Sequence, residues 1–225
     1  MKKSVFGSHA CAAALLACAT PAHADEETGW SFEAGVASSY IGGDFNQQFS
    51  DDPVIQLTGT YNFTPILYAN AYVYSGFDSV FESQSSEYGF EVGADSFPLF
   101  ANITGSLSAG RFANYGGQGS NVGDWFVKGG LSVGDFHISH SRYLNVTDGS
   151  ATNIGYDFNL SEKLVVTPSV AYLNLYDDTF NAWNPGLAAS YALGDAWHVN
   201  AVAVWSENED GGRDEAFSVS VVWNH

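Results

Sequence analysis

The segment Phe217-Ser218-Val219-Ser220-Val221-Val222-Trp223 alternates apolar residues with serine over most of its length. Successive side chains of a β-strand point to opposite faces, so one face of this segment is apolar and the other is small and polar. The apolar face carries Phe217, Val219, Val221 and Trp223, and the opposite face carries Ala216, Ser218 and Ser220. This pattern is typical of a membrane β-barrel wall, whose apolar side faces lipid.

The same alternation recurs between residues 30 and 223. The connections between the runs are short and long in turn, and the long ones are polar and acidic. We therefore predict an all-β fold, a transmembrane antiparallel up-and-down β-barrel with its long loops on one side. Twelve strands fit best, with ten or eight as alternatives, and they cover residues 30–40, 54–63, 66–77, 86–97, 99–111, 124–133, 136–143, 151–160, 164–176, 185–193, 197–206 and a last strand that ends at Trp223.

Short turns are expected at the opposite end of the strands. Pro98 is predicted to close one of them, because proline lacks the N–H that a paired strand requires. The dipeptide 134–135, Gly-Asp, is a two-residue hairpin signal that pairs Val133 with Phe136. The strand 164–176 is apolar on both faces, so its orientation is left unassigned.

Tryptophans fall near both ends of the predicted strands, as in the aromatic girdles of membrane barrels. Those near the short turns are Trp30, Trp197 and Trp223, and those near the long loops are Trp125 and Trp205. A soluble β-sandwich or lipocalin-like barrel is the alternative, but its solvent-facing strands would carry mixed charges. Here the less apolar face is mostly Gly, Ser, Thr, Asn and Ala, which favours the membrane barrel.

Residues 1–24 are predicted to be an export signal, followed by the barrel at 25–225. Lys2 and Lys3 precede a short apolar stretch, and the segment 22–24, Ala-His-Ala, is a small-x-small cleavage site. An alternative is a lipoprotein cleavage box with Cys18 as the lipidated residue. Both cysteines, Cys11 and Cys18, precede the predicted cleavage site, so the mature chain would have no disulfide.

Removal of that signal leaves five basic and 25 acidic residues, a net charge of −20. Such a chain is not expected to bind nucleic acid, which is itself a polyanion. No apolar run approaches the roughly 18 residues that a membrane helix needs. We therefore expect a protein of the bacterial outer membrane, in contact with outer-membrane lipid.

Short motifs in the chain resemble known barrels. The segment 217–223 is similar to the C-terminal recognition signal of outer-membrane barrels, although Asn224 and His225 follow its final aromatic residue. That resemblance implies recognition by the barrel-insertion machinery. Four segments resemble the TorF-type porins of proteobacteria, which implies an outer-membrane pore without catalytic residues: Ser39-Tyr40-Ile41, Pro53-Val54-Ile55-Gln56, Gly134-Asp135-Phe136 and Ser141-Arg142-Tyr143-Leu144.

Acidic residues recur on one face of the predicted strand 86–97. Glu87, Glu91 and Asp95 are four residues apart and share the inward face, as Glu33 does on the first strand. Unpaired carboxylates in a dry interior would cost several kcal/mol each. A water-filled lumen, or pairing with Lys128, Arg111 or Arg142, would relieve that cost, and Lys128 is the base placed inward. The acids then form either a cation-favouring wall or a structural network that plugs the barrel.

Two further groups are candidates for contact with a solute. Tyr68, Tyr72 and Tyr74 share a face and could stack against sugar or nucleoside rings, or simply belong to a tyrosine-rich barrel wall. His137 and Ser139 form a His-x-Ser pair, which resembles the pair in outer-membrane phospholipase A and lipid A deacylase. The hairpin geometry points this pair inward, where it also fits a polar lumen lining.

The sequence predicts no enzyme activity, no cofactor and no metal site. We predict a porin-like channel for passive diffusion of small polar or cationic solutes. One alternative is a non-conducting structural or adhesive barrel with acidic extracellular loops. The other is a barrel lipid hydrolase that uses His137 and Ser139.

Overall fold

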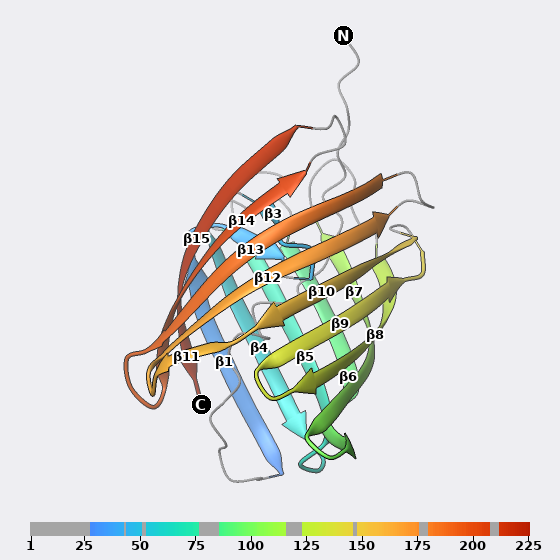
Figure 1. Cartoon of the computed structure of the whole chain (residues 1–225). Coiled ribbons are helices and arrows are strands. Elements are labelled where there is room, and N and C mark those ends of the chain that lie inside the picture. Colours follow the sequence, from blue (N-terminus) through green and yellow to red (C-terminus); the bar gives the residue numbers. More distant parts are fainter. Residues whose placement is uncertain are drawn as a thin grey trace.

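In the computed structural model, the wall strands form a single antiparallel ring (Figure 1). The structure describes residues 28–42, 44–50, 53–76, 86–115, 123–145, 148–175, 180–207 and 212–225. The predicted signal at 1–24, with Cys11 and Cys18, lies outside these residues, and so does the predicted loop at 78–85. The described part of the chain contains no helix long and apolar enough to cross a membrane.

Each strand of the ring pairs with its neighbours in chain order, and β1 closes it by pairing with β15. The first six strands of the wall are β1 (Gly29–Ala37), β4 (Val54–Asn62), β5 (Leu67–Gly76), β6 (Ser86–Phe100), β7 (Ile103–Tyr115) and β8 (Gly123–Val133). The others are β9 (Phe136–Tyr143), β10 (Gly149–Tyr156) with its continuation β11 (Phe158–Ser161), β12 (Leu164–Leu175), β13 (Phe180–Ala192), β14 (Trp197–Glu207) and β15 (Arg213–Asn224).

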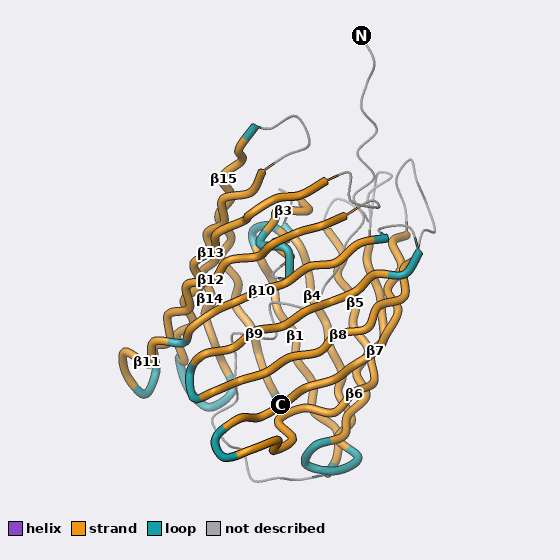
Figure 2. Tube along the Cα trace, turned by 45° about the vertical axis from the view of Figure 1, so that its right-hand side comes forward, coloured by secondary structure: helices purple, strands orange, loops and turns teal. Residues whose placement is uncertain are grey.

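The strand predicted at 151–160 is present as two pieces, β10 and β11, separated by Asp157. Both pieces pair with β12, so they occupy one place in the ring. Counted this way, the ring has the predicted twelve strands, and no edge is left unpaired. Figure 2 shows the short connections at one end of the barrel, the turn-side end. The opposite end, where the long connections lie, is the loop-side end.

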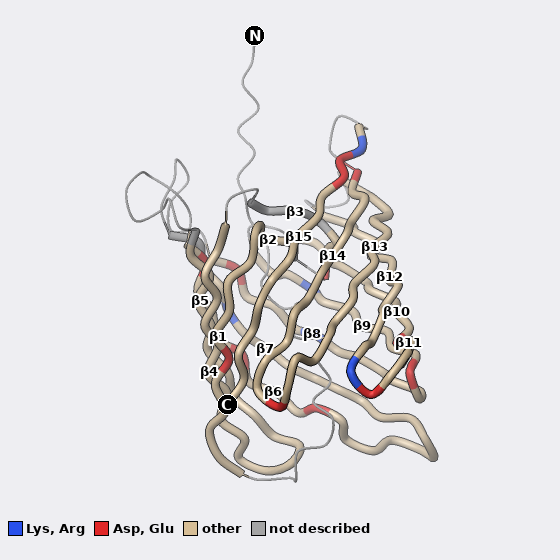
Figure 3. Tube along the Cα trace, turned by 90° about the vertical axis from the view of Figure 1, so that its left-hand side faces the viewer, with Lys and Arg blue, Asp and Glu red and all other residues tan. Residues whose placement is uncertain are grey.

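The outer wall is apolar, as the alternation predicted. On β15, Phe217 is 62% exposed, and Val219 and Val221 are exposed beside it, whereas Ser218 and Ser220 are buried. Strands β12, β13 and β14 carry no Lys, Arg, Asp or Glu before Glu207, and Figure 3 shows these strands free of charged positions over most of their length. The exposed tryptophans lie toward both rims: Trp30 and Trp197 on the turn side, and Trp125, Trp183 and Trp205 on the loop side.

Local pairing confirms the predicted hairpin at 134–135. Val133 pairs with Phe136, and Gly134 adopts φ +58°, a conformation that favours glycine. The structure also assigns the orientation of β12, which the sequence left open. Thr167, Ala171 and Leu173 are buried and face inward.

Two strand boundaries that were predicted at prolines were wrong. Pro98 does not close a turn but lies inside β6, paired with Thr104, because the register of β6 with β7 shifts on both sides of it. Such irregular positions tolerate a residue without an N–H. Pro185 does not begin a strand, because β13 already starts at Phe180. Pairing of β13 with β14 begins only at Gly186, so Pro185 has a ladder partner on one side alone, Val170 of β12.

The connection between β1 and β4 was predicted as an external loop at 42–52, but its described part folds inward. It contains two short paired strands, β2 (Tyr40–Gly42) and β3 (Gln47–Ser50). We refer to the described residues of this connection, 38–42 and 44–50, as the inner loop. Asp44, Phe45 and Asn46 are buried at its tip, against the inner face of the barrel. The alternation of the strands could not predict this, because it describes the wall and not what enters it.

Candidate channel lumen

The inward face of the barrel differs between its two ends. In the loop-side half, large side chains pack into one buried apolar cluster with the inner loop, and its larger members are Tyr40, Phe45, Tyr72, Tyr74, Phe112, Phe126, Tyr143, Leu173 and Leu175. In the turn-side half, most inward side chains are polar. Some are buried, namely Thr167, Ser190, Ser220 and the apolar Val222, and the partly buried ones include Thr60, Tyr68, Asn70, Ser106, Ser132, His137, Ser139, Asn153 and Asn200. The polar surface expected of a channel is therefore concentrated in one half of the barrel.

Three of the four predicted acids lie on the inner wall together. Glu87 and Glu91 are buried on β6, and Glu33 lies on β1, where its carboxylate accepts a hydrogen bond of 3.4 Å from Gln56 Nε2. Asp95 stands apart from them. It is exposed where the β6 register shifts after Ala94, and its carboxylate accepts a hydrogen bond of 2.7 Å from the backbone N–H of Ser96.

Of the three bases considered as partners for these acids, Arg111 and Arg142 lie on the other face of the wall. Lys128 does point inward, but its Nζ lies 2.8 Å from Asp44 Oδ1 on the inner loop. Arg111 lies over the outward ring of Trp125, and Arg142 bonds Asp148 at 2.6 Å with half of its side chain exposed. The reason is register, because Arg111 and Arg142 fall on the outward positions of β7 and β9. The inner-wall acids thus lack these two partners.

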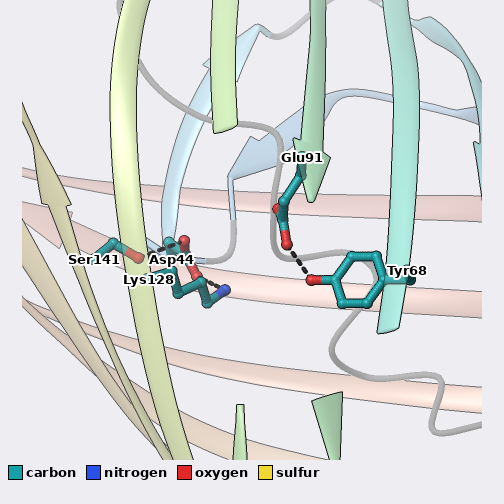
Figure 4. Close-up of polar contacts among 5 residues, drawn as sticks. All are labelled: Asp44, Tyr68, Glu91, Lys128 and Ser141. Carbon is teal, nitrogen blue, oxygen red and sulfur yellow. Dashed lines mark hydrogen bonds and ion pairs between the residues drawn. The ribbon is translucent and has the colours of Figure 1, made fainter. Parts of the chain in front are cut away.

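Figure 4 shows the inward polar contacts at the middle of the barrel. The Asp44 carboxylate is shared, since Oδ1 meets Lys128 and Oδ2 accepts a hydrogen bond of 3.1 Å from Ser141 Oγ. The Glu91 carboxylate accepts a hydrogen bond from the hydroxyl of Tyr68. One carboxylate is therefore neutralised by a base, and the other is held by a neutral donor.

The three predicted tyrosines face inward, but they do not form one surface. Tyr68 is partly exposed and bonds Glu91. Tyr74 is buried and stacks on Tyr40 of the inner loop, with ring centroids 5.0 Å apart, and Tyr72 packs on Tyr74 at 5.5 Å. In this arrangement Tyr68 is the one of the three that remains available to a solute.

His137 and Ser139 face the lumen in the turn-side half. His137 Nδ1 lies 3.9 Å from Asp157 Oδ2, and the other oxygen of Asp157 accepts a hydrogen bond of 2.5 Å from Thr167 Oγ1. Within the described residues, no hydrogen bond joins His137 to Ser139. Gly155 makes room for the imidazole, since a Cβ there would lie 2.3 Å from Nε2.

Several lumen residues were not singled out from the sequence, chief among them Asp44, Asn46, Asp157 and Asn184. Asp157 has the inward parity of its strand, so alternation could have found it. Asp44 and Asn46 lie in a connection, where no periodicity indicates direction. In the part of the chain that the structure describes, no group of three His, Cys, Asp or Glu residues is placed to hold a metal ion.

A closed ring with an apolar outer wall and a partly polar inner wall defines a transmembrane β-barrel. The chain belongs to the outer membrane protein beta-barrel domain family, whose model matches residues 10–224. This confirms the predicted fold class and its membrane.

Solved structures share this fold at low sequence identity. The KdgM porin matches with a TM-score of 0.58 and 12% identity, over 86% of this chain and 98% of that chain. A structure of the KdgM porin in complex with disordered oligogalacturonate matches with a TM-score of 0.57, at the same identity and coverage. The Acinetobacter baumannii outer membrane protein Omp33 matches with a TM-score of 0.54 and 10% identity, over 89% and 99% of the two chains. A search of curated proteins finds no match.

These likenesses extend to small porins and show a common fold. The narrower resemblance to TorF-type porins stays a prediction.

Proposed function

We propose that the protein is a porin-like channel through which small polar or cationic solutes diffuse passively. The observation that carries this proposal is the polar inner wall of the turn-side half. Asn70 Oδ1 is buried there and accepts no hydrogen bond from the described residues, and the same holds for Gln56 Oε1 nearer the loop side. Buried polar atoms of this kind are normally satisfied by water, which supports a hydrated lumen.

The distribution of charge supports a preference for cations. Of the five bases that follow the predicted signal, Arg111 and Arg142 face outward, and Lys163 and Arg213 lie at strand ends. The fifth, Lys128, is paired with Asp44. Among the described residues, the inward acids Glu87, Glu91 and Asp157 add to the pair of Asp44 and Lys128, so acids outnumber bases in the lumen and its net negative charge attracts cations.

The negative charge of the lumen also indicates which class of solute fits the channel. The KdgM porin was solved with oligogalacturonate, a chain of sugar acids that each carry a carboxylate. Negative groups on the inner wall of this chain would repel such a polyanion. We therefore propose neutral or cationic solutes here, in spite of the shared fold.

Ion selectivity in a planar bilayer tests the proposal. We expect a cation-selective reversal potential in a salt gradient, strongest at low salt, because the screening length falls from about 10 Å at 0.1 M to about 3 Å at 1 M. The double variant Glu87→Gln, Glu91→Gln should move the reversal potential toward zero. The exposed pair Asp214→Asn, Glu215→Gln at the loop end of β15 is the control and should change it little. Anion preference in the wild type would refute the acidic filter.

A second function is favoured by the packed loop-side half. If the apolar cluster and the inner loop close the lumen, the protein is a non-conducting structural or adhesive barrel. Absence of any conductance from correctly folded protein would support that reading. The hydrolase alternative requires lipid at Ser139, which faces inward, and Ser139→Ala would have to abolish lipid hydrolysis to support it.

Export and assembly form part of the proposal. We propose that residues 1–24 direct export and that the barrel-insertion machinery recognises the last strand. Trp223 faces outward beside Trp197 and ends the apolar face of β15. Trp223→Asp should therefore lower the amount of protein in the outer membrane sharply, and an unchanged amount would argue against this role.

A further inference from the structure

We propose that the inner loop is the constriction of the channel, held across the lumen by the ion pair between Asp44 and Lys128. This inference rests on the proposed channel function and names the element that sets its width. It is carried by the path of the loop, its attachment to the wall and the burial of its tip.

The inner loop reaches the opposite wall of the barrel. It leaves β1 and returns to β4, which are neighbours in the ring. Its Asp44 contacts Lys128 of β8 and Ser141 of β9. The ring has twelve strands, and β9 is the sixth strand from β1 in either direction, so this contact joins opposite sides of the barrel. A chain segment on that path crosses the lumen and does not line one wall.

A second set of contacts attaches the loop to another part of the wall. Asn46 Nδ2 donates to the carbonyl oxygen of Asn184 on β13 at 2.9 Å and to Ser169 Oγ on β12 at 3.1 Å. In return, Asn184 Nδ2 donates to the carbonyl oxygen of Phe45 at 2.8 Å. Asn184 also accepts from the backbone N–H of Glu207 at 3.1 Å, which fixes its amide. The loop tip is therefore bound on two sides by polar contacts.

The wall is shaped to receive the tip. Phe45 has no exposed surface and stacks on Tyr143, with ring centroids 5.4 Å apart. Gly186 lies where Asn46 meets β13, and a Cβ at that position would lie 2.9 Å from the side-chain atoms of Asn46. The base of the loop is attached as well, because Ser218 Oγ donates to the carbonyl oxygen of Ser39 at 2.8 Å.

Of these contacts, the ion pair is the one whose loss should release the tip. The Asp44 side chain is 5% exposed and that of Lys128 is 19% exposed. A carboxylate buried without its base is strongly unfavourable, so it moves toward water. The loop is the movable partner, because Lys128 belongs to a strand paired on both sides. Loss of either charge should therefore free the tip and widen the lumen.

Two opposite charge changes separate this tether from a purely electrostatic role. Lys128→Met makes the lumen more negative, and Asp44→Asn makes it less negative. If the pair acts only through charge, the two variants shift cation selectivity in opposite directions at similar conductance. If the pair is a tether, both raise single-channel conductance, by at least twofold in our expectation. The swap Asp44→Lys, Lys128→Asp keeps both the pair and the net charge, and should return conductance toward that of the wild type.

Controls and a charge-free variant complete the design. Lys163→Met makes the same chemical change in the exposed turn before β12 and should leave conductance unchanged. Gly186→Val displaces Asn46 without changing charge and should also raise conductance. Its control is Gly129→Val, where no atom lies closer than 4.0 Å to the added Cβ. Heat-modifiable gel mobility identifies folded barrels, and Gly186→Val still tests the tip if an ion-pair variant fails to fold.

The outcomes distinguish this inference from the channel function itself. If the wild type conducts and Lys128→Met, Asp44→Asn and Gly186→Val conduct more, both the channel function and the constriction by the inner loop are supported. A conducting wild type with unchanged variants overturns the constriction and leaves the channel. A silent wild type with conducting variants supports the tether but shows a closed barrel in place of an open porin. Silence in the wild type and in all folded variants overturns both.

Discussion

The loop-side and turn-side halves of the lumen belong to the same strands but have different chemistry. On β12, Leu173 and Leu175 face inward near the loops, whereas Thr167 and Ser169 face inward nearer the turns. On β9 the loop-side residue is Tyr143 and the turn-side residue is His137. The apolar residues occur where the inner loop excludes water. The inner wall is thus core-like at one end and channel-like at the other, because burial is set by what enters the barrel.

The largest effect is expected when one charge is placed in each half of the lumen. Ala171 of β12 and Ala188 of β13 both face inward, but Ala171 has no exposed surface and Ala188 is only partly buried. Ala171→Asp should destabilise the barrel by about 3 kcal/mol or more, since its carboxylate would be buried without a partner. Ala188→Asp should cost about 1 kcal/mol or less, because lumen water can solvate it.

Denaturant unfolding of the two variants in lipid vesicles measures this contrast. Both substitutions start from alanine on neighbouring strands, so strand propensity and side-chain size cancel. Equal losses of unfolding free energy would mean that the turn-side half is as dry as the loop-side half. That result would also argue against the proposed channel function.

A second test measures access of water directly. Ser139 and Ser141 are both inward serines of β9, two residues apart, and Ser141 is 1% exposed while Ser139 is partly exposed. With the predicted signal removed, the chain has no other cysteine, so Ser139→Cys and Ser141→Cys each provide a single thiol. We expect a charged methanethiosulfonate reagent to modify Cys at 139 at least tenfold faster than Cys at 141. Similar rates would place the boundary between the halves elsewhere.

The wall could be predicted from the sequence because its signal is local. Each strand carries its own alternation, as at 217–223, and each hairpin carries its own turn residues, as at Gly134. Closure into a ring then follows from the even strand count and the need to pair every edge. Boundaries were less predictable, because Pro98 and Pro185 are tolerated where pairing is irregular or one-sided.

The lumen could be predicted only in part. Alternation identified Glu33, Glu87, Glu91, Lys128 and His137 as inward residues, but not what they touch. Asp44 meets a base 84 positions away, and Asn46 meets a strand 138 positions away. Such contacts depend on the path of a connection through space, which leaves no periodic trace in the sequence. The assignment of Tyr72 and Tyr74 to a solute surface missed the inner loop for the same reason.

The smallest contrast compares two hydroxyl groups that donate to carboxylates. Ser141 donates to Asp44 in the loop-side half, and Tyr68 donates to Glu91, with Tyr68 itself partly exposed to the turn-side lumen. Ser141→Ala should lower the free energy of unfolding by about 2 kcal/mol, because no water replaces the lost donor to a buried charge. Tyr68→Phe should lose less than about 1 kcal/mol, since a lumen water can donate to Glu91 in its place. Tyr68→Phe should also leave the reversal potential cation-selective, because the carboxylate keeps its charge. If Tyr68→Phe proves the more damaging of the two, Glu91 is as dry as Asp44, and the hydrated part of the lumen begins nearer the turns than Tyr68.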